Sequence, residues 1–221
     1  MLQGLIFDLD GVLTNSAKYH LGAWLAIANE LGIKLTDKEC EGLRGLSRMD
    51  SLDYILKIGK QELPLAVKEK LAAKKNDLFL KEVEKMTTDD ILPGISELLA
   101  DAKKRHLKMA IASASKNAPK ILSKLGILDE FDAMVDPASL SKGKPDPEIF
   151  LKAAQAINLD NSEVISFEDA QAGVAAIKAA GQFAVGIGDK DLLIKADYLV
   201  SNTSQLKLDD IISAYEKKRG E

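Results

Sequence analysis

Hydrophobic and polar positions divide the chain into three stretches with different periodicity. The first is a short apolar run at residues 5–7, which predicts a buried strand. From about residue 15 to residue 87, apolar residues recur at helical spacing and no strand pattern occurs. From residue 91 onward, apolar runs typical of strands alternate with amphipathic helical segments. The pattern therefore predicts a helical insertion between the first strand and the remainder of an α/β domain.

Capping signals predict four helices within the insertion. Ser16 and Thr36 are candidate N-caps of the first two helices, and Ser47 or Asp50 is the candidate cap of a third. Pro64 begins a long fourth helix. We expect these helices to form a small bundle.

The alternating stretch predicts five further strands. They are expected at residues 107–113, 133–135, 163–167, 183–187 and 198–200. Strands that alternate with helices are typical of a parallel sheet with helices on both faces. The first strand belongs to this sheet, because alone it could bury nothing. The expected fold class is α/β, a doubly wound, Rossmann-like parallel sheet in a core domain of residues 1–14 and 88–221, with an inserted α-helical cap domain of residues 15–87.

Composition and charge narrow the class of protein. The chain has 221 residues, of which 46% are hydrophobic and 29% charged, as in ordinary soluble globular proteins. A net charge of -4 argues against nucleic acid as a main partner. Cys40 is the single cysteine, which excludes an internal disulfide and fits a reducing compartment. Because no long apolar span and no leader pattern occur, we expect a cytoplasmic protein with no membrane partner.

Two acidic residues directly follow the first strand. Asp8 and Asp10 are one residue apart, so strand periodicity directs both toward one side of the sheet, and Gly11 then permits a tight turn. Open α/β sheets bind their ligands at the carboxyl ends of strands. Two carboxylates this close favour a bound cation, and Mg²⁺ is the natural choice. The alternative interpretation, two ordinary polar residues at a strand end, is equally compatible with this motif alone.

Three later segments bring polar groups to the same edge of the sheet. Residues 113–117 follow a strand and open a helix, where hydroxyls and free N–H groups make either an anion site or an ordinary N-cap. Lys144 lies in a glycine- and proline-bounded loop, where a lysine is usually solvated. Glu168 and Asp169 end a strand ahead of a helix, where the helix dipole favours acids in any case.

Taken together, these groups suit phosphoryl transfer. A phosphate dianion repels a carboxylate nucleophile, so such a site needs a divalent cation, a lysine and N–H donors. Asp8 could then attack phosphorus to form an aspartyl phosphate, while Asp10 exchanges protons with the leaving and accepting oxygens. The expected metal ligands are Asp8, Asp169 and a backbone carbonyl near Asp10, with Glu168 close by.

The four motifs resemble those of the haloacid dehalogenase-like phosphotransferase superfamily. The matching segments are Phe7-Asp8-Leu9-Asp10-Gly11-Val12, Ala112-Ser113-Ala114-Ser115, Lys144-Pro145 and Phe167-Glu168-Asp169. The resemblance implies a Mg²⁺-dependent enzyme with this core and a cap. Asp10, which dehalogenases generally lack, points to phosphate rather than halide chemistry.

Within the superfamily the chain looks similar to sugar-phosphate mutases, including the cap segment at residues 45–51. This likeness implies interconversion of β-glucose 1-phosphate and glucose 6-phosphate through β-glucose 1,6-bisphosphate. It implies that Ser113, Ala114 and Lys144 hold the transferring phosphate, that Arg48, Ser115, Lys116 and Asn117 hold the other phosphate, and that His20 and Lys75 position Asp10. Other residues expected near the substrate are Ser16, Trp24, Gly45, Leu46 and Ser51.

Two other functions remain open at this stage. A phosphatase for small sugar phosphates shares every core residue and differs only in passing the phosphoryl group to water. Arg48, with Lys116 and Asn117, favours the mutase, because a bisphosphate needs a second anion site. A non-catalytic sugar-phosphate-binding protein is disfavoured by the intact acidic residues and lysine. In every case the expected partners are small sugar phosphates, and we expect a monomer.

Two positions depart from the resemblance. Asn15 stands where the family commonly has aspartate, and Lys18 stands where it has an acid. Neither removes a group that the chemistry requires, but both leave the choice of sugar open.

Overall fold

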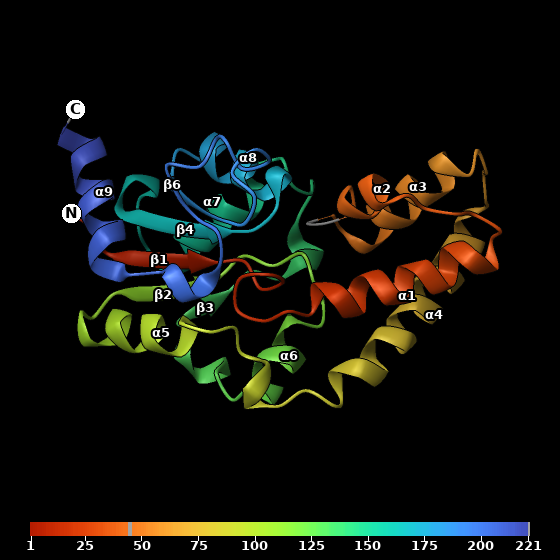
Figure 1. Ribbon diagram of the computed structural model, residues 1–221, viewed down its shortest axis with the longest axis horizontal. Helices are drawn as coiled ribbons and strands as arrows, with labels where there is room; N and C mark the ends of the chain where they lie inside the picture. The colour runs from red at the N-terminus through yellow and green to blue at the C-terminus, as the bar shows by residue number, and fades with distance from the viewer. Residues whose placement is uncertain (44–45, 221) are drawn as a thin grey trace.

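A parallel sheet forms the centre of one half of the molecule (Figure 1). The computed structural model describes residues 1–43 and 46–220. In this part of the chain, the sheet has the order β3-β2-β1-β4-β5-β6, and every neighbouring pair is parallel. The strands are β1 (Gly4–Phe7), β2 (Lys108–Ile111), β3 (Ala133–Met134), β4 (Val164–Glu168), β5 (Phe183–Ile187) and β6 (Tyr198–Val200). The first strand of the chain is therefore central, between β2 and β4.

Helices cover both faces of the sheet. One face is covered by α5 (Ile95–Lys104), α6 (Ala118–Lys124) and α9 (Leu208–Gly220), and the other by α7 (Glu148–Ala156) and α8 (Gln171–Ala179). Leu5 and Phe7 point into the first layer and Ile6 into the second, as strand alternation requires. Because both faces are buried, β1 is an unbroken apolar run. The predicted doubly wound α/β fold is confirmed.

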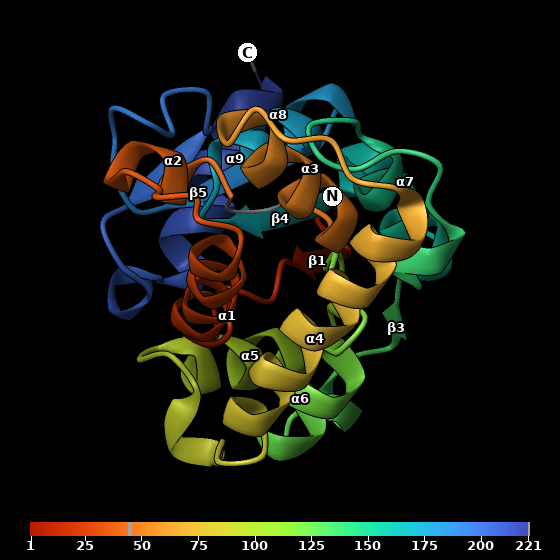
Figure 2. The same cartoon turned by 90° about the vertical axis from the view of Figure 1, so that its right-hand side faces the viewer.

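In the described residues 15–43 and 46–87, four helices lie between β1 and the rest of the core, and we call them the cap. They are α1 (Ala17–Glu30), α2 (Asp37–Glu41), α3 (Arg48–Ile58) and α4 (Leu65–Val83). Trp24, Ile27, Leu52 and Ile55 form part of an apolar cluster that belongs to the cap itself. Seen from the cap end, α1, α3 and α4 surround the carboxyl end of β1 (Figure 2).

The cap and the core are joined through α4. Its first half packs in the cap cluster through Ala72, whereas Phe79 and Val83 in its second half belong to the apolar cluster beneath the sheet. Short 3-10 helices connect the other elements: η1 (Thr88–Asp90), η2 (Leu128–Glu130), η3 (Pro137–Ser139), η4 (Asn161–Glu163) and η5 (Thr203–Gln205). None of the described helices is long and apolar enough to cross a membrane.

The helix caps and strand ends agree with the sequence-based predictions at some positions and differ from them at others. The Thr36 and Ser47 hydroxyls accept capping bonds from the N–H groups of Glu39 and Asp50, as predicted. Ser16 occupies the predicted N-cap position of α1, but its side chain makes no capping bond there. The predicted strand at residues 107–113 is shorter, since β2 ends at Ile111. That early end leaves Ser113 in the loop that faces the cap.

Candidate active site

A cavity of about 1110 Å³ lies between the carboxyl edge of the sheet and the cap. It is lined by most of the residues predicted from the sequence, namely Asp8, Asp10, His20, Trp24, Leu46, Arg48, Ser51, Lys75, Ser113, Ala114, Ser115, Lys116, Lys144 and Asp169. Asn15 and Lys18 line it as well. Ser16, Asn117 and Glu168 are not part of the lining, and Gly45 lies outside the described residues.

Asp8 sits at the buried floor of this cavity. It is the first residue after β1, and its N–H donates to the carbonyl of Phe167 at 3.0 Å. Lys144 Nζ donates to Asp8 Oδ1 at 2.6 Å and to Glu168 Oε2 at 2.8 Å. Burial disfavours the charge of Lys144, but the two carboxylates outweigh it and raise its pKa. Lys144 is therefore a fixed cation at the end of the central strands.

The acidic side chains here outnumber the lysine. Oxygen atoms of Asp8, Glu168 and Asp169 all lie within 4.8 Å of one another. Burial raises the pKa of Asp8 against the opposing charge of Lys144, and burial together with the Asp8 charge raises the pKa of Glu168 to about 8. An all-oxygen cluster with excess negative charge is the donor set of a hard divalent cation. The cluster is a candidate metal site.

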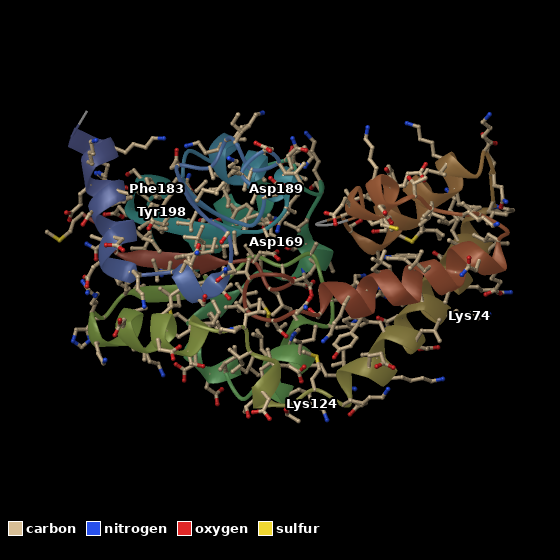
Figure 3. The ribbon with its side chains drawn as sticks, viewed as in Figure 1. Lys74, Lys124, Asp169, Phe183, Asp189 and Tyr198 are labelled. Carbon is tan, nitrogen blue, oxygen red and sulfur yellow. The ribbon has the colours of Figure 1, made fainter. Side chains whose placement is uncertain are left out.

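The three carboxylates are not equivalent in this cluster. Glu168 is fully buried; one oxygen accepts from Lys144, and the other accepts from the Ala170 N–H at 3.2 Å. Asp8 and Asp169 line the cavity, and Figure 3 shows Asp169 between the sheet and the cap. A metal ion in the cavity would thus meet Asp8 and Asp169 first. The expected contribution of the Asp10 backbone carbonyl remains a prediction.

Gly11 allows Asp169 to approach the turn after β1. Its φ is +85°, and a Cβ placed there would lie 1.9 Å from Asp169 Oδ2. The Asp10 N–H donates to Asp8 Oδ2 at 3.0 Å within the same turn. The turn therefore needs glycine both for its backbone conformation and for the space that the carboxylate occupies.

Asp10 is surrounded by a separate set of groups. The hydroxyl of Ser16, which is fully buried, donates to Asp10 Oδ1. His20 Nε2 lies 3.6 Å from Asp10 Oδ2. Burial raises the pKa of Asp10, which the Ser16 hydrogen bond opposes. Ser16 thus acts behind Asp10 and not on the cavity surface.

The contact between His20 and Lys75 indicates which ring nitrogen of His20 carries the proton. Lys75 Nζ lies 2.6 Å from His20 Nδ1, and an ammonium group can only donate. When Lys75 is protonated, Nδ1 is the acceptor and the ring proton resides on Nε2, which lies 3.6 Å from Asp10 Oδ2. Burial, with the charges of Lys75 and Arg48, lowers the pKa of His20 well below its ordinary value. His20 is therefore a neutral group that presents N–H to Asp10.

At the opposite side of the cavity, hydroxyl groups organise the loop after β2. Ser113 Oγ accepts from the Ser115 N–H at 3.1 Å, and Ser115 Oγ accepts from the Asn117 N–H at 3.3 Å. The Asn117 side chain makes no capping bond to α6, so the ordinary N-cap interpretation is wrong for this residue. Its amide nitrogen is directed toward the cap instead.

Asn76 is the site residue that sequence reasoning missed. Its Oδ1 accepts from Arg48 Nη2 at 2.7 Å and from Asn117 Nδ2 at 2.8 Å. Nothing local distinguishes this asparagine on a polar stretch of α4, because both of its partners are far away in the sequence.

Comparison with known proteins agrees with this architecture. A family model described as haloacid dehalogenase-like hydrolase matches residues 2–181. The chain belongs to this family. The resemblance inferred from the four motifs of this haloacid dehalogenase-like protein is thereby confirmed.

Individual relatives narrow the comparison within the haloacid dehalogenase-like hydrolases. Beta-phosphoglucomutase of Bacillus subtilis (strain 168) is 44% identical over 99% of this chain and 97% of its own length. The crystal structure of beta-phosphoglucomutase from Clostridium difficile has a TM-score of 0.98 and 41% identity, with all of both chains covered. Validoxylamine A 7'-phosphate phosphatase of Streptomyces hygroscopicus subsp. limoneus is 29% identical over 94% of this chain and 97% of its own.

Proposed function

We propose that this protein is an enzyme that interconverts β-glucose 1-phosphate and glucose 6-phosphate, as a β-phosphoglucomutase does. The observation that carries the proposal is the likeness to such enzymes over the whole chain, cap included. The cap matters because it contributes Trp24, Arg48 and Lys75 to the cavity that would hold the sugar. In this enzyme, residues 1–14 and 88–221 would form the core domain and residues 15–87 the cap domain.

Asp8 is the proposed nucleophile. Its carboxylate lines the cavity beside Lys144, which offsets negative charge on an incoming phosphoryl group. Attack on phosphorus gives an aspartyl phosphate, and the C6 hydroxyl of β-glucose 1-phosphate then takes the phosphoryl group to form β-glucose 1,6-bisphosphate. After the bisphosphate turns around, its C1 phosphate returns to Asp8 and glucose 6-phosphate leaves. Ser113 and Ala114, in the loop opposite, contribute to holding the transferring phosphate.

The proposed cofactor is Mg²⁺. Asp8 and Asp169 would hold it together with a backbone carbonyl near Asp10, while Glu168 supports the cluster from behind. When bound, the ion supplies charge neutralisation between the carboxylates and the phosphate. The donor set fits, because it consists of oxygen atoms whose negative charge one lysine does not balance.

Asp10 is the proposed general acid and base. It takes the proton of the attacking sugar hydroxyl and returns one to the leaving oxygen. A raised pKa favours the protonated form that the donating step requires. The Ser16 hydroxyl holds one carboxylate oxygen, and the other, which lies 3.6 Å from His20 Nε2 without a hydrogen bond to it, is the oxygen that would exchange the proton.

Arg48, Ser115 and Lys116 are proposed to hold the phosphate that is not being transferred. Arg48 is half-buried in the cavity, and its guanidinium offers several donors to one phosphate. Asn117 acts on this site through Asn76. Trp24, Leu46 and Ser51 contribute to the wall against the sugar, and small sugar phosphates are the partners that this cavity fits.

A sugar-phosphate phosphatase is the second candidate, because a phosphatase is among the full-length relatives. Both activities begin with the same aspartyl phosphate and differ in whether sugar or water accepts the phosphoryl group. The test supplies β-glucose 1-phosphate, Mg²⁺ and a trace of β-glucose 1,6-bisphosphate, and measures glucose 6-phosphate and free phosphate together. Glucose 6-phosphate in large excess supports the mutase, whereas free phosphate as the main product supports the phosphatase.

A further inference from the structure

Three polar side chains meet where the cap touches the core. Arg48 is the first residue of α3, Asn76 lies within α4, and Asn117 immediately precedes α6. The carboxamide oxygen of Asn76 accepts both hydrogen bonds, at 2.7 Å from Arg48 and 2.8 Å from Asn117. One oxygen atom therefore joins two cap helices to the core.

The three residues face the cavity differently. Arg48 lines it, whereas Asn76 and Asn117 lie outside the lining. The bond from Nη2 to Asn76 restrains one end of the guanidinium, and its other N–H groups can donate to an anion. Asn76 thus contacts Arg48 from outside the cavity lining.

The contact with Asn76 does not neutralise the positive charge of Arg48. Among the described residues, Arg48 donates one hydrogen bond to a neutral amide and takes part in no ion pair with a carboxylate. An aspartate at position 76 would accept the same two bonds but would offset the positive charge. A neutral acceptor orients the guanidinium and keeps its attraction for phosphate.

We propose that Asn76 is a positioning residue with two linked roles. It holds the cap on the core through Asn117, and it orients Arg48 toward the distal phosphate. The proposal rests on the proposed function in one respect, that Arg48 holds the phosphate not being transferred. Arg48 and Asn76 both belong to the cap, so lifting the cap would break the bond to Asn117 and leave the bond to Arg48, and the Asn76 amide would lose the second contact that fixes its orientation. The distal anion site is therefore complete only when the cap is seated.

The first test measures whether the cap is packed on the core, and it requires no substrate turnover. Trp24 is the single tryptophan of the chain, and its side chain is 3% exposed at the cavity wall. In the full-length protein with Mg²⁺ and no sugar, Asn76→Ala should raise the acrylamide quenching constant of Trp24 about twofold. Asn29→Ala, which removes an exposed amide from α1, is the matched control and should leave quenching unchanged.

The second test separates orientation from charge. Asn76→Ala should raise the KM for β-glucose 1,6-bisphosphate about tenfold, as expected for loss of a bond to a charged group, while kcat changes less than about threefold. Hydrolysis of acetyl phosphate, which has no distal phosphate, should stay within about twofold of the unmutated enzyme. Asn76→Asp should keep Trp24 quenching normal and still raise the KM, because its carboxylate offsets the charge of Arg48.

The outcomes are decisive in each case. Normal quenching in Asn76→Ala overturns the proposal, and so does a KM unchanged in both variants. An equal loss with acetyl phosphate would also overturn it, because such a loss indicates a general structural role. If the unmutated protein turns over no glucose phosphate, the proposed function fails, and the quenching comparison still decides whether Asn76 seats the cap.

Discussion

The side-chain nitrogen of Lys75 lies 2.6 Å from Nδ1 of His20, on the cap side of the cavity. The Lys75 side chain also lies over the rings of Trp24 and Phe79, and it is only 2% exposed. Burial and the nearby charge of Arg48 lower the pKa of Lys75 to about 7, against the opposing charge of Asp10. Burial of Lys75 beside His20 therefore lowers the stability of the folded protein.

That cost gives the fold a pH dependence. An unfolded lysine titrates near 10.4, so between pH 7 and pH 10 the unfolded chain binds a proton that the folded protein has released. Stability of the unmutated protein should thus rise from pH 6 to pH 9 by about 3 kcal/mol relative to Lys75→Met. Urea unfolding at the two pH values measures the difference. A gap between the two proteins that does not change with pH would contradict the assignment.

Gly11 and Gly181 provide a matched pair of substitutions. Both have positive φ, but a Cβ at Gly181 meets nothing within 4 Å, whereas one at Gly11 meets Asp169. Alanine at either position should destabilise the fold by about 1 kcal/mol. Gly11→Ala should in addition weaken the apparent affinity for Mg²⁺ about tenfold or more, as measured by titrating activity with the metal. Similar metal dependence in the two variants would show that Asp169 is not held by this turn.

Metal binding should be visible in thermal unfolding. An ion that binds only the folded protein stabilises it by about 3 kcal/mol at a hundred times its dissociation constant. Adding Mg²⁺ should raise the Tm, and EDTA should reverse the increase. Asp169→Asn should lose most of this shift because it removes a carboxylate from the cluster. A shift of the same size in that variant would place the metal elsewhere.

Arg48→Ala should separate the two ends of the cavity. The guanidinium is proposed to bind only the distal phosphate, so its removal should lower mutase turnover about a hundredfold. Hydrolysis of acetyl phosphate, followed by release of inorganic phosphate, should fall far less. Equal losses in the two reactions would argue against a distal-phosphate role.

The central part of the fold was readable from local patterns in the sequence. Strand alternation and the end of an apolar run placed Asp8 and Asp10 at the sheet edge, and chain order placed Lys144 and Asp169 near them. Local signals suffice here because parallel strands all end at the same edge of the sheet, so residues that follow different strands lie close together. The cavity gathers the same groups.

What the sequence could not supply depends on contacts between distant segments. Ser16 has the identity of an N-cap, yet its hydroxyl is used by Asp10 across the turn. Asn76 joins Arg48 of α3 to Asn117, which precedes α6, so its contacts depend on how the cap packs on the core. No periodicity in one segment encodes that placement.

The central claim is that Asp8 carries the phosphoryl group between the two ends of the sugar. Rapid acid quenching of the enzyme with Mg²⁺ and radiolabelled β-glucose 1,6-bisphosphate, followed by peptide mapping, tests it most directly. We expect label on Asp8, which passes to glucose phosphate when unlabelled β-glucose 1-phosphate is added, and no label in Asp8→Asn. Label on Ser113 or any other residue, or full turnover by Asp8→Asn, would contradict it.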